Sequence, residues 1–299
     1  MAAPHPALQV RHPNAVYDAA FSPDGKLLAT ASLDHSAKVW NLQTGEELRT
    51  LLGHGDGVCG VFFVAEGKKL VTASMDKTLR IWDVASGTSL ATMSGHSQYI
   101  ECLAGAPNRE LVASGGYDNV VRVWDVESAA QKYALSGHGD TIYAIAFSPD
   151  SELLASGSIN ESLLLWSMKS GEKLGPLEGH DGPVEGIAFS PDGKMFATAS
   201  GDGRVRLGSV ASRVVTAELE GHPNYAKCVA FAPQQPLLAS ACRDGEIRLW
   251  NPQSHDNLVT LKAHANSIYS VRFSPQGKQL VSASFDRTAK VWDVGQLLK

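Results

Sequence analysis

Residues 53–95 read GHGDGVCGVFFVAEGKKLVTASMDKTLRIWDVASGTSLATMSG, and four residues of this stretch recur along the chain at an interval of 42 residues. The four are His54, Thr72, Asp76 and Trp82. All six tryptophans fall on this grid, at Trp40, Trp82, Trp124, Trp166, Trp250 and Trp292. Seven units of this length account for nearly all of the 299 residues. The sequence therefore predicts a repeat array that forms a single domain over residues 1–299.

The other three positions recur without a gap. The histidines are His12, His54, His96, His138, His180, His222 and His264. The hydroxyl position holds Thr30, Thr72, Ser114, Ser156, Thr198, Ser240 and Ser282. The acidic position holds Asp34, Asp76, Asp118, Asn160, Asp202, Asp244 and Asp286. Four positions that keep one register over seven units indicate that each unit folds in the same way.

Each unit is predicted to contain four short strands. The first follows the histidine, as in Tyr17–Phe21, and a Ser-Pro-Asp-Gly turn such as 22–25 ends it. The second carries small residues at alternate positions, for example Ala29 and Ala31, which let a neighbouring sheet approach closely. The third leads to the tryptophan, and a Thr-Gly or Ser-Gly turn leads to the fourth. Strands of about five residues at this spacing, without helical periodicity, indicate an all-β fold.

The Gly-His, Ser-x-Asp and Trp-Asp elements at this spacing resemble the WD-repeat β-propeller family over essentially the whole chain. The resemblance implies a seven-bladed β-propeller of four-stranded antiparallel blades, numbered here from His12 onward. It also implies a hydrogen-bonded tetrad in each blade, which would satisfy the N–H of the buried indole. The tetrads carried over are His54, Thr72, Asp76 and Trp82; His96, Ser114, Asp118 and Trp124; His222, Ser240, Asp244 and Trp250; and His264, Ser282, Asp286 and Trp292.

The ends of the chain are expected to close the ring. Too few residues follow Trp292 for a turn and a fourth strand. Residues 1–11 stand where the fourth strand of a repeat precedes its histidine, so we expect them to complete blade seven, as in similar propellers. Gln9 aligns with the inward position of the other blades. A one-residue slip that turns Leu8 or Val10 inward is the alternative, and the sequence leaves the register open.

Composition excludes several function classes. A net charge of −5 and a pI near 6.1 give no broad attraction to nucleic acid or anionic lipid. No apolar run approaches the roughly 18 residues of a membrane span, and no signal-peptide pattern opens the chain. The four cysteines form no CxxC pair and are expected as buried thiols in a reducing compartment. These features favour a cytoplasmic or nuclear location.

Catalysis, metals and cofactors are not expected. Seven equivalent copies of a hydroxyl, a histidine and an aspartate indicate a structural device, because a hydrolase needs one activated nucleophile with an oxyanion site. No Walker loop, dinucleotide fingerprint or HExxH motif occurs, and histidines on different blades are poorly placed to share a metal ion. Most repeats carry Lys or Arg two residues before the tryptophan position. We interpret this as a blade feature rather than an RNA-binding ring.

Two blades depart from the pattern. Blade four has Asn160 for aspartate, and blade five has Gly208 and Ser209 where Trp-Asp is expected. Drift is tolerated in repeat arrays because stability is a sum over neighbouring units. The alternative is a loosened sector that meets a partner.

Function is expected where positions differ between blades. In similar propellers, partners often dock on the top face, where the turns after the histidine and before the aspartate meet the central channel. Aromatic and charged side chains at these positions suit peptide recognition. The candidate partner-binding residues are Tyr17, Leu33, Met75, Tyr99, Glu101, Tyr117, Tyr143, Ile159, Glu185, Tyr225, Lys227, Arg243, Tyr269 and Phe285.

The sequence thus predicts a non-catalytic scaffold that binds protein or peptide partners on its top face, as a monomeric propeller within a multiprotein complex. One alternative is a substrate-recognition subunit of an enzyme assembly such as a ubiquitin ligase. Another is a subunit of an RNA-decay complex, because spacing and strand content in the middle repeats resemble the WD-repeat subunit of the Ski complex.

Overall fold

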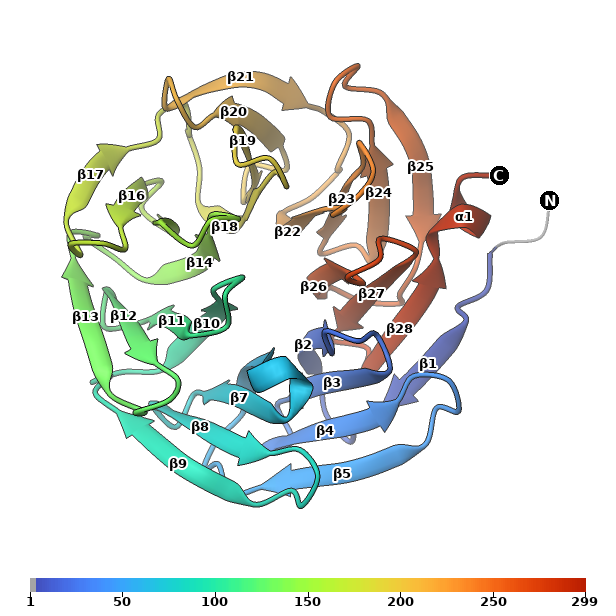
Figure 1. Cartoon of the computed structure of the whole chain (residues 1–299). Coiled ribbons are helices and arrows are strands. Elements are labelled where there is room, and N and C mark those ends of the chain that lie inside the picture. Colours follow the sequence, from blue (N-terminus) through green and yellow to red (C-terminus); the bar gives the residue numbers. More distant parts are fainter. Residues whose placement is uncertain (1–3) are drawn as a thin grey trace.

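The computed structural model of the protein describes residues 4–299. Their strands form seven four-stranded antiparallel sheets, arranged radially about a common centre like the blades of a propeller (Figure 1). The seven-bladed all-β fold expected from the period of the sequence is confirmed. Among the described residues, no helix has the length and apolarity that crossing a membrane requires.

In blades one to six, the strands follow one another in chain order from the centre outward (Figure 1). Blade one contains β2 (Val16–Phe21), β3 (Leu27–Ser32), β4 (Ser36–Asn41) and β5 (Glu47–Leu52). Blade two contains β6 (Val58–Val64), the short 3₁₀ helix η1 (Ala65–Gly67), β7 (Lys69–Ser74), β8 (Thr78–Asp83) and β9 (Ser89–Ser94). Blade three contains β10 (Ile100–Gly105), β11 (Leu111–Gly116), β12 (Val120–Asp125) and β13 (Gln131–Ser136).

The second half of the ring repeats this order. Blade four contains β14 (Ile142–Phe147), β15 (Leu153–Ser158), β16 (Leu163–Ser167) and β17 (Lys173–Pro176). Blade five contains β18 (Val184–Phe189), β19 (Met195–Ser200), β20 (Val205–Ser209) and β21 (Val214–Leu219). Blade six contains β22 (Ala226–Phe231), β23 (Leu238–Cys242), β24 (Glu246–Trp250) and β25 (Asn257–Lys262). Blade seven contains β26 (Ile268–Phe273), β27 (Gln279–Ser284), β28 (Thr288–Asp293) and β1 (Leu8–Arg11).

Blade seven is completed by the N-terminal strand, which runs antiparallel to β28 and lies beside it (Figure 1). Val10 lies opposite Ala289 and is 4% exposed, so Val10, and not Gln9, takes the inward position. The reason is the length of the connection. Blade one has two residues between Leu51 and His54, whereas blade seven has only Arg11 between Val10 and His12. Residues 1–3 of the expected closing segment lie outside the described residues.

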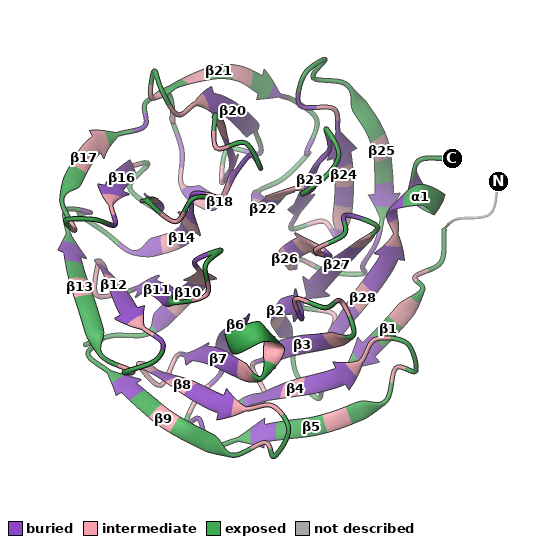
Figure 2. Ribbon diagram, viewed as in Figure 1, coloured by how far each residue is buried: buried purple, intermediate pink, exposed green. Residues whose placement is uncertain are grey.

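Apolar cores lie between neighbouring blades. The inner three strands of each blade are mostly buried, and the outermost strand is mostly exposed, with at most one buried residue (Figure 2). Buried alanines at alternate positions of the second strand, such as Ala29 and Ala31, belong to the core between blades one and two. Small side chains there let adjacent sheets pack closely, as the sequence pattern suggested.

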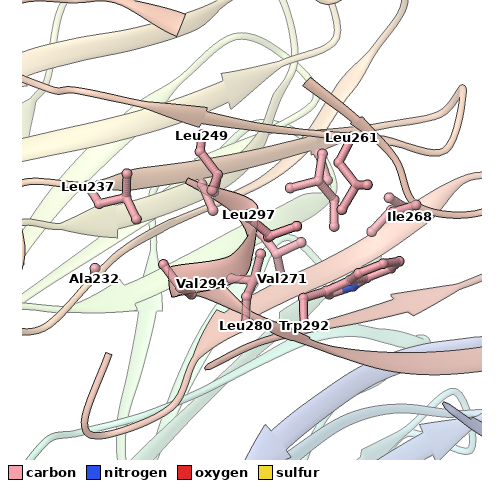
Figure 3. Packing of buried hydrophobic residues seen from close by; sticks show 14 residues of the cluster. Ala232, Leu237, Leu249, Leu261, Ile268, Val271, Leu280, Trp292, Val294 and Leu297 are labelled. Atoms are coloured by element: carbon pink, nitrogen blue, oxygen red, sulfur yellow. The ribbon is translucent and has the colours of Figure 1, made fainter. Parts of the chain in front are cut away.

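The core between blades six and seven also includes the C-terminal helix (Figure 3). Helix α1 (Val294–Leu297) begins after Asp293, whose side chain accepts a hydrogen bond from the backbone N–H of Gln296 at 2.8 Å. This N-cap satisfies one of the free donors of the first turn. Val294 and Leu297 are both buried against the cluster that contains Trp292. The chain end is thereby fixed to the ring beside the blade that β1 closes.

Candidate protein-binding face

A hydrogen-bonded chain of four side chains supports the top-face turns of blades one, two, three and seven. In blade two, Nδ1 of His54 donates to Asp76 at 2.8 Å, and Nε2 lies 2.7 Å from Oγ1 of Thr72. The same hydroxyl accepts the indole N–H of Trp82 at 2.8 Å. The hydroxyl can accept from the indole and donate to the imidazole, in the tautomer that carries its proton on Nδ1. Equivalent bonds link the corresponding residues of blades one, three and seven.

The basic residue before the tryptophan packs within its blade. The ammonium group of Lys38 lies 5.4 Å from the ring centroid of Trp40, and the guanidinium of Arg80 lies 5.9 Å from that of Trp82. Lys290 and Trp292 repeat this contact at 5.9 Å. Cation–π contacts thus give the basic residue a role within the blade in blades one, two and seven.

Blades four, five and six lack the direct bond from histidine to the acidic position, and in blade five Nδ1 of His180 has no hydrogen-bond partner among residues 4–299. In blade four, Nδ1 of His138 lies 2.6 Å from Oγ of Ser162, which in turn donates to Asn160 at 2.7 Å. In blade six, the expected tetrad is one member short, because Nδ1 of His222 has no hydrogen-bond partner among the described residues. The carboxylate of Asp244 instead accepts from the backbone N–H of Glu246 at 2.9 Å and from the thiol of Cys242. Cys242 stands where most blades have a serine, and it directs the carboxylate away from the imidazole.

Blade five is rearranged around its missing tryptophan. Phe196 lies directly opposite Gly208, at a position where blades one, two, four, six and seven have leucine. The space of the indole is filled, because a Cβ on Gly208 would lie 2.0 Å from Cζ of Phe196. Arg206 is fully buried and donates to Asp202 at 2.6 Å and to Glu218 at 2.9 Å. In blade five the larger residue, Phe196, is on the second strand and the smaller one, Gly208, is on the third, the reverse of the other blades. Phe196 thus compensates for the missing tryptophan, and the blade is not left open.

The innermost strand of every blade has a β-bulge at one position. The register shifts in the same place in all seven blades, for example between Val16 and Asp18 in blade one. A bulge leaves one residue unpaired and re-aims its side chain. The seven bulged residues form what we call the channel ring: Tyr17, Cys59, Glu101, Tyr143, Glu185, Lys227 and Tyr269. All seven line a central cavity of about 560 Å³.

The six candidate residues in the channel ring are partly buried rather than freely exposed. The rings of Tyr17 and Tyr269 stack with their centroids 4.2 Å apart. Lys227 donates to Glu185 at 2.6 Å. Its ammonium group also lies 5.4 Å from the ring centroid of Tyr143 and 5.8 Å from that of Tyr269. Lys227 therefore links tyrosines from opposite sides of the channel.

Two aromatic clusters extend from the channel ring onto the top face. In the Tyr117 cluster, Tyr117 contacts Tyr99 and Tyr143 edge to face, with centroids 6.1 and 6.5 Å apart. In the Phe285 cluster, Phe285 packs against Tyr269 at 6.3 Å, and Tyr269 against Tyr17. Tyr99, Tyr117 and Phe285 are 46–47% exposed, although large aromatic side chains gain free energy from burial. Each cluster thus presents an apolar surface supported from below by the channel ring.

The remaining candidates lie between and beside these clusters. The guanidinium of Arg243 lies 4.3 Å from the ring centroid of Tyr225, which packs over Gly201, a residue without a side chain. Leu33 and Met75 lie against Gly57 and are partly buried. Ile159 is 39% exposed. No cluster of acidic, histidine or cysteine side chains among residues 4–299 could hold a metal ion.

Comparison with known families agrees with this geometry. The family model described as WD domain, G-beta repeat matches the chain seven times, over residues 7–41, 45–83, 87–125, 130–167, 171–207, 213–251 and 256–293. The chain belongs to this WD-repeat family. Each match begins one or two residues before the outermost strand of one blade and ends at the third strand of the next, so each WD repeat spans two blades. No curated protein matches the sequence of the chain.

The WD-repeat pattern did not reveal one buried charge that joins three blades. The carboxylate of Asp18 accepts from Ser270 at 2.7 Å and from Arg272 at 2.7 Å, both in blade seven. It also accepts from the backbone N–H of Val61 in blade two at 3.1 Å. Asp18 therefore ties the first blade to both of its neighbours. Its signal in the sequence was slight: it is the one charged residue six positions after a repeat histidine.

Proposed function

We propose that this WD-repeat propeller is a non-catalytic scaffold that binds a protein or peptide partner on its top face, within a multiprotein complex of the cytoplasm or nucleus. The WD-repeat fold supports binding of protein partners in general. The observation that carries the finer proposal is the pair of half-exposed aromatic clusters joined across the channel by Lys227. Aromatic anchors held rigidly from below lose little conformational entropy on binding.

Charges around the clusters would orient the partner. Arg243 is exposed beside Tyr225, at a position suited to an acidic group of the partner. Glu185 is held by Lys227, so its charge is largely neutralised within the protein. Exposed charges at an interface rim act mainly on association rate and specificity.

Titration of the captured native partner against variants tests the proposal. Phe285→Ala and Tyr117→Ala should each weaken binding at least about tenfold, because truncation of a central aromatic anchor typically costs 2 kcal/mol or more. Their thermal midpoints should change little, since both side chains are half-exposed. Arg243→Glu should slow association, and added salt should reduce its effect.

Leu258→Ala is the matched control, because Leu258 is 46% exposed on the outermost strand of blade six, far from the channel. It should bind like the unmodified protein. Normal binding by Phe285→Ala, Tyr117→Ala and Arg243→Glu, together with failure of the Leu258 variant, would move the binding site to the outer rim and overturn the proposal.

A further inference from the structure

The walls of the central cavity contain one more acidic residue than basic residues. Its acidic residues are Asp18, Glu101 and Glu185, and its basic residues are Lys227 and Arg272. Asp18 pairs with Arg272 at 2.7 Å, and Glu185 pairs with Lys227 at 2.6 Å. The carboxylate of Glu101 has no ion pair and no hydrogen bond within residues 4–299. The channel therefore has one uncompensated negative charge, and it is located at Glu101.

The surroundings of Glu101 favour a cation. Glu101 is the bulge residue of blade three, and Tyr17 and Tyr143 belong with it to the channel ring. Aromatic faces attract cations, as the contacts of Lys227 with Tyr143 and Tyr269 already show. A cation placed beside Glu101 would gain a charge-assisted hydrogen bond in a partly desolvated site.

Small side chains line much of the cavity wall next to the channel ring. Three residues along each inner strand from the channel ring, blades three to six have alanine: Ala104, Ala146, Ala188 and Ala230. Blade one also has alanine, Ala20, whereas blade two has Phe62, whose ring lies against Gly105 of blade three, and blade seven has Arg272, which pairs with Asp18. The alanines of blades three to six thus leave room in the cavity for an inserted side chain.

We propose that the channel binds a single basic side chain of the partner, a lysine or an arginine, whose cation pairs with Glu101. This inference rests on the proposed function and specifies its ligand chemistry. Lys227 does not compete for Glu101, because its ammonium group is engaged by Glu185. The flanking aromatic clusters would then bind the apolar residues beside the basic one.

Protonation of Glu101 makes binding dependent on pH. Burial raises the pKa of Glu101 to about 7; the Lys227 charge opposes this shift and the Glu185 charge adds to it. A bound cation favours the ionised form, so binding requires loss of the proton. Affinity should rise about tenfold between pH 6 and pH 8 and then level off.

The groups packed around Glu101, on its own strand and on others, are either held neutral by burial or paired with each other. Burial raises the pKa of the Tyr17 and Tyr143 phenols, from β2 and β14, so both stay neutral. Burial also raises the pKa of the Cys59 and Cys102 thiols, from β6 and β10. Glu185 and Lys227, from β18 and β22, remain paired with each other.

The test is a selection of short random peptides, displayed on phage, against the full chain. A basic residue should be enriched at one position, and the selected peptide is then titrated with lysine, arginine or norleucine at that position. Norleucine keeps the apolar stem without the charge, and it should weaken binding at least about tenfold. Glu101→Gln should produce the same loss and abolish the pH dependence of a histidine-free peptide.

The matched control is Glu127→Gln, the same change on an exposed turn of blade three outside the channel. It should leave affinity unchanged. Equal affinity for the norleucine peptide, unchanged binding by Glu101→Gln, or no enrichment of a basic residue would each overturn the inference. If the selected peptides lack a basic residue but lose affinity with Tyr117→Ala or Phe285→Ala, the proposed top-face binding is supported and the basic-residue inference is refuted. If Tyr117→Ala, Phe285→Ala and Glu101→Gln all leave binding unchanged, both the proposed function and this inference are refuted.

Discussion

Restoring tryptophan to blade five should destabilise the protein unless the opposite residue is changed with it. In Gly208→Trp, the new Cβ would lie 2.0 Å from Cζ of Phe196, which is fully buried. Overpacking of this kind costs about 1–3 kcal/mol. We therefore expect a loss of at least about 2 kcal/mol in the free energy of unfolding.

Phe196→Leu alone should destabilise for the opposite reason. It removes ring atoms that fill the space above Gly208, and it leaves a cavity between β19 and β20. Truncation of a buried phenylalanine to alanine costs about 3–5 kcal/mol, so a change to leucine should cost about 2 kcal/mol.

The double variant should recover most of both losses. Leucine opposite tryptophan is the arrangement of blade six, where Leu238 pairs with Trp250. A tryptophan at 208 would also find Oγ1 of Thr198 as its acceptor, in the way that Ser240 accepts from Trp250 at 2.8 Å. The coupling energy between the two substitutions should be about 2–3 kcal/mol.

Urea unfolding followed by far-ultraviolet circular dichroism measures the three free energies without interference from the added indole. The mirror exchange in blade six, Leu238→Phe with Trp250→Gly, is the matched control and should show coupling of the same sign. A double variant as unstable as the sum of the two single variants would refute the compensation that we describe.

Three further predictions concern closure, blade contacts and pH. Deletion of residues 1–11 should remove β1, cost several kcal/mol through lost apolar burial and pairing, and cause association through the open edge, which light scattering would detect; a stable monomer would contradict the closure model. Asp18→Ala should cost about 3–5 kcal/mol in thermal or urea unfolding, because it leaves Arg272 unpaired at the junction of three blades; an unchanged midpoint would refute that role. Burial lowers the pKa of three histidines to about 4, namely His138, His180 and His222. The unfolded chain therefore binds more protons below pH 6.5, and the free energy of unfolding measured with urea should fall between pH 6.5 and 4, by roughly 3 kcal/mol per histidine at pH 4. Midpoints should fall again below pH 4 as Asp34 protonates, since hydrogen bonds from His12 and Ser36 outweigh burial and lower its pKa to about 2; a flat profile from pH 7 to 4 would exclude the histidine contribution.

The sequence by itself determined the architecture of this WD-repeat protein. The interval between tryptophans set the number of blades, and the turn residues set where each strand begins and ends. These features are local and repeated seven times, so an error in one repeat is corrected by the other six. The resemblance to the family also anticipated the hydrogen bonds of His54, Thr72, Asp76 and Trp82. Blade six has the same residue types at the same spacing but lacks the bond from His222 to Asp244, so the pattern alone does not decide every tetrad.

Only the tertiary structure decided the features that occur once. The register of β1 depends on a connection one residue shorter than in blade one, and Val10 rather than Gln9 is buried as a result. The exchange of Phe196 with Gly208 became visible only when the two strands were paired. The lone charge of Glu101 depends on which acids of other blades have found basic partners across the channel. Such contacts join residues many positions apart, and no periodic pattern encodes them, because each is made by one pair of side chains only.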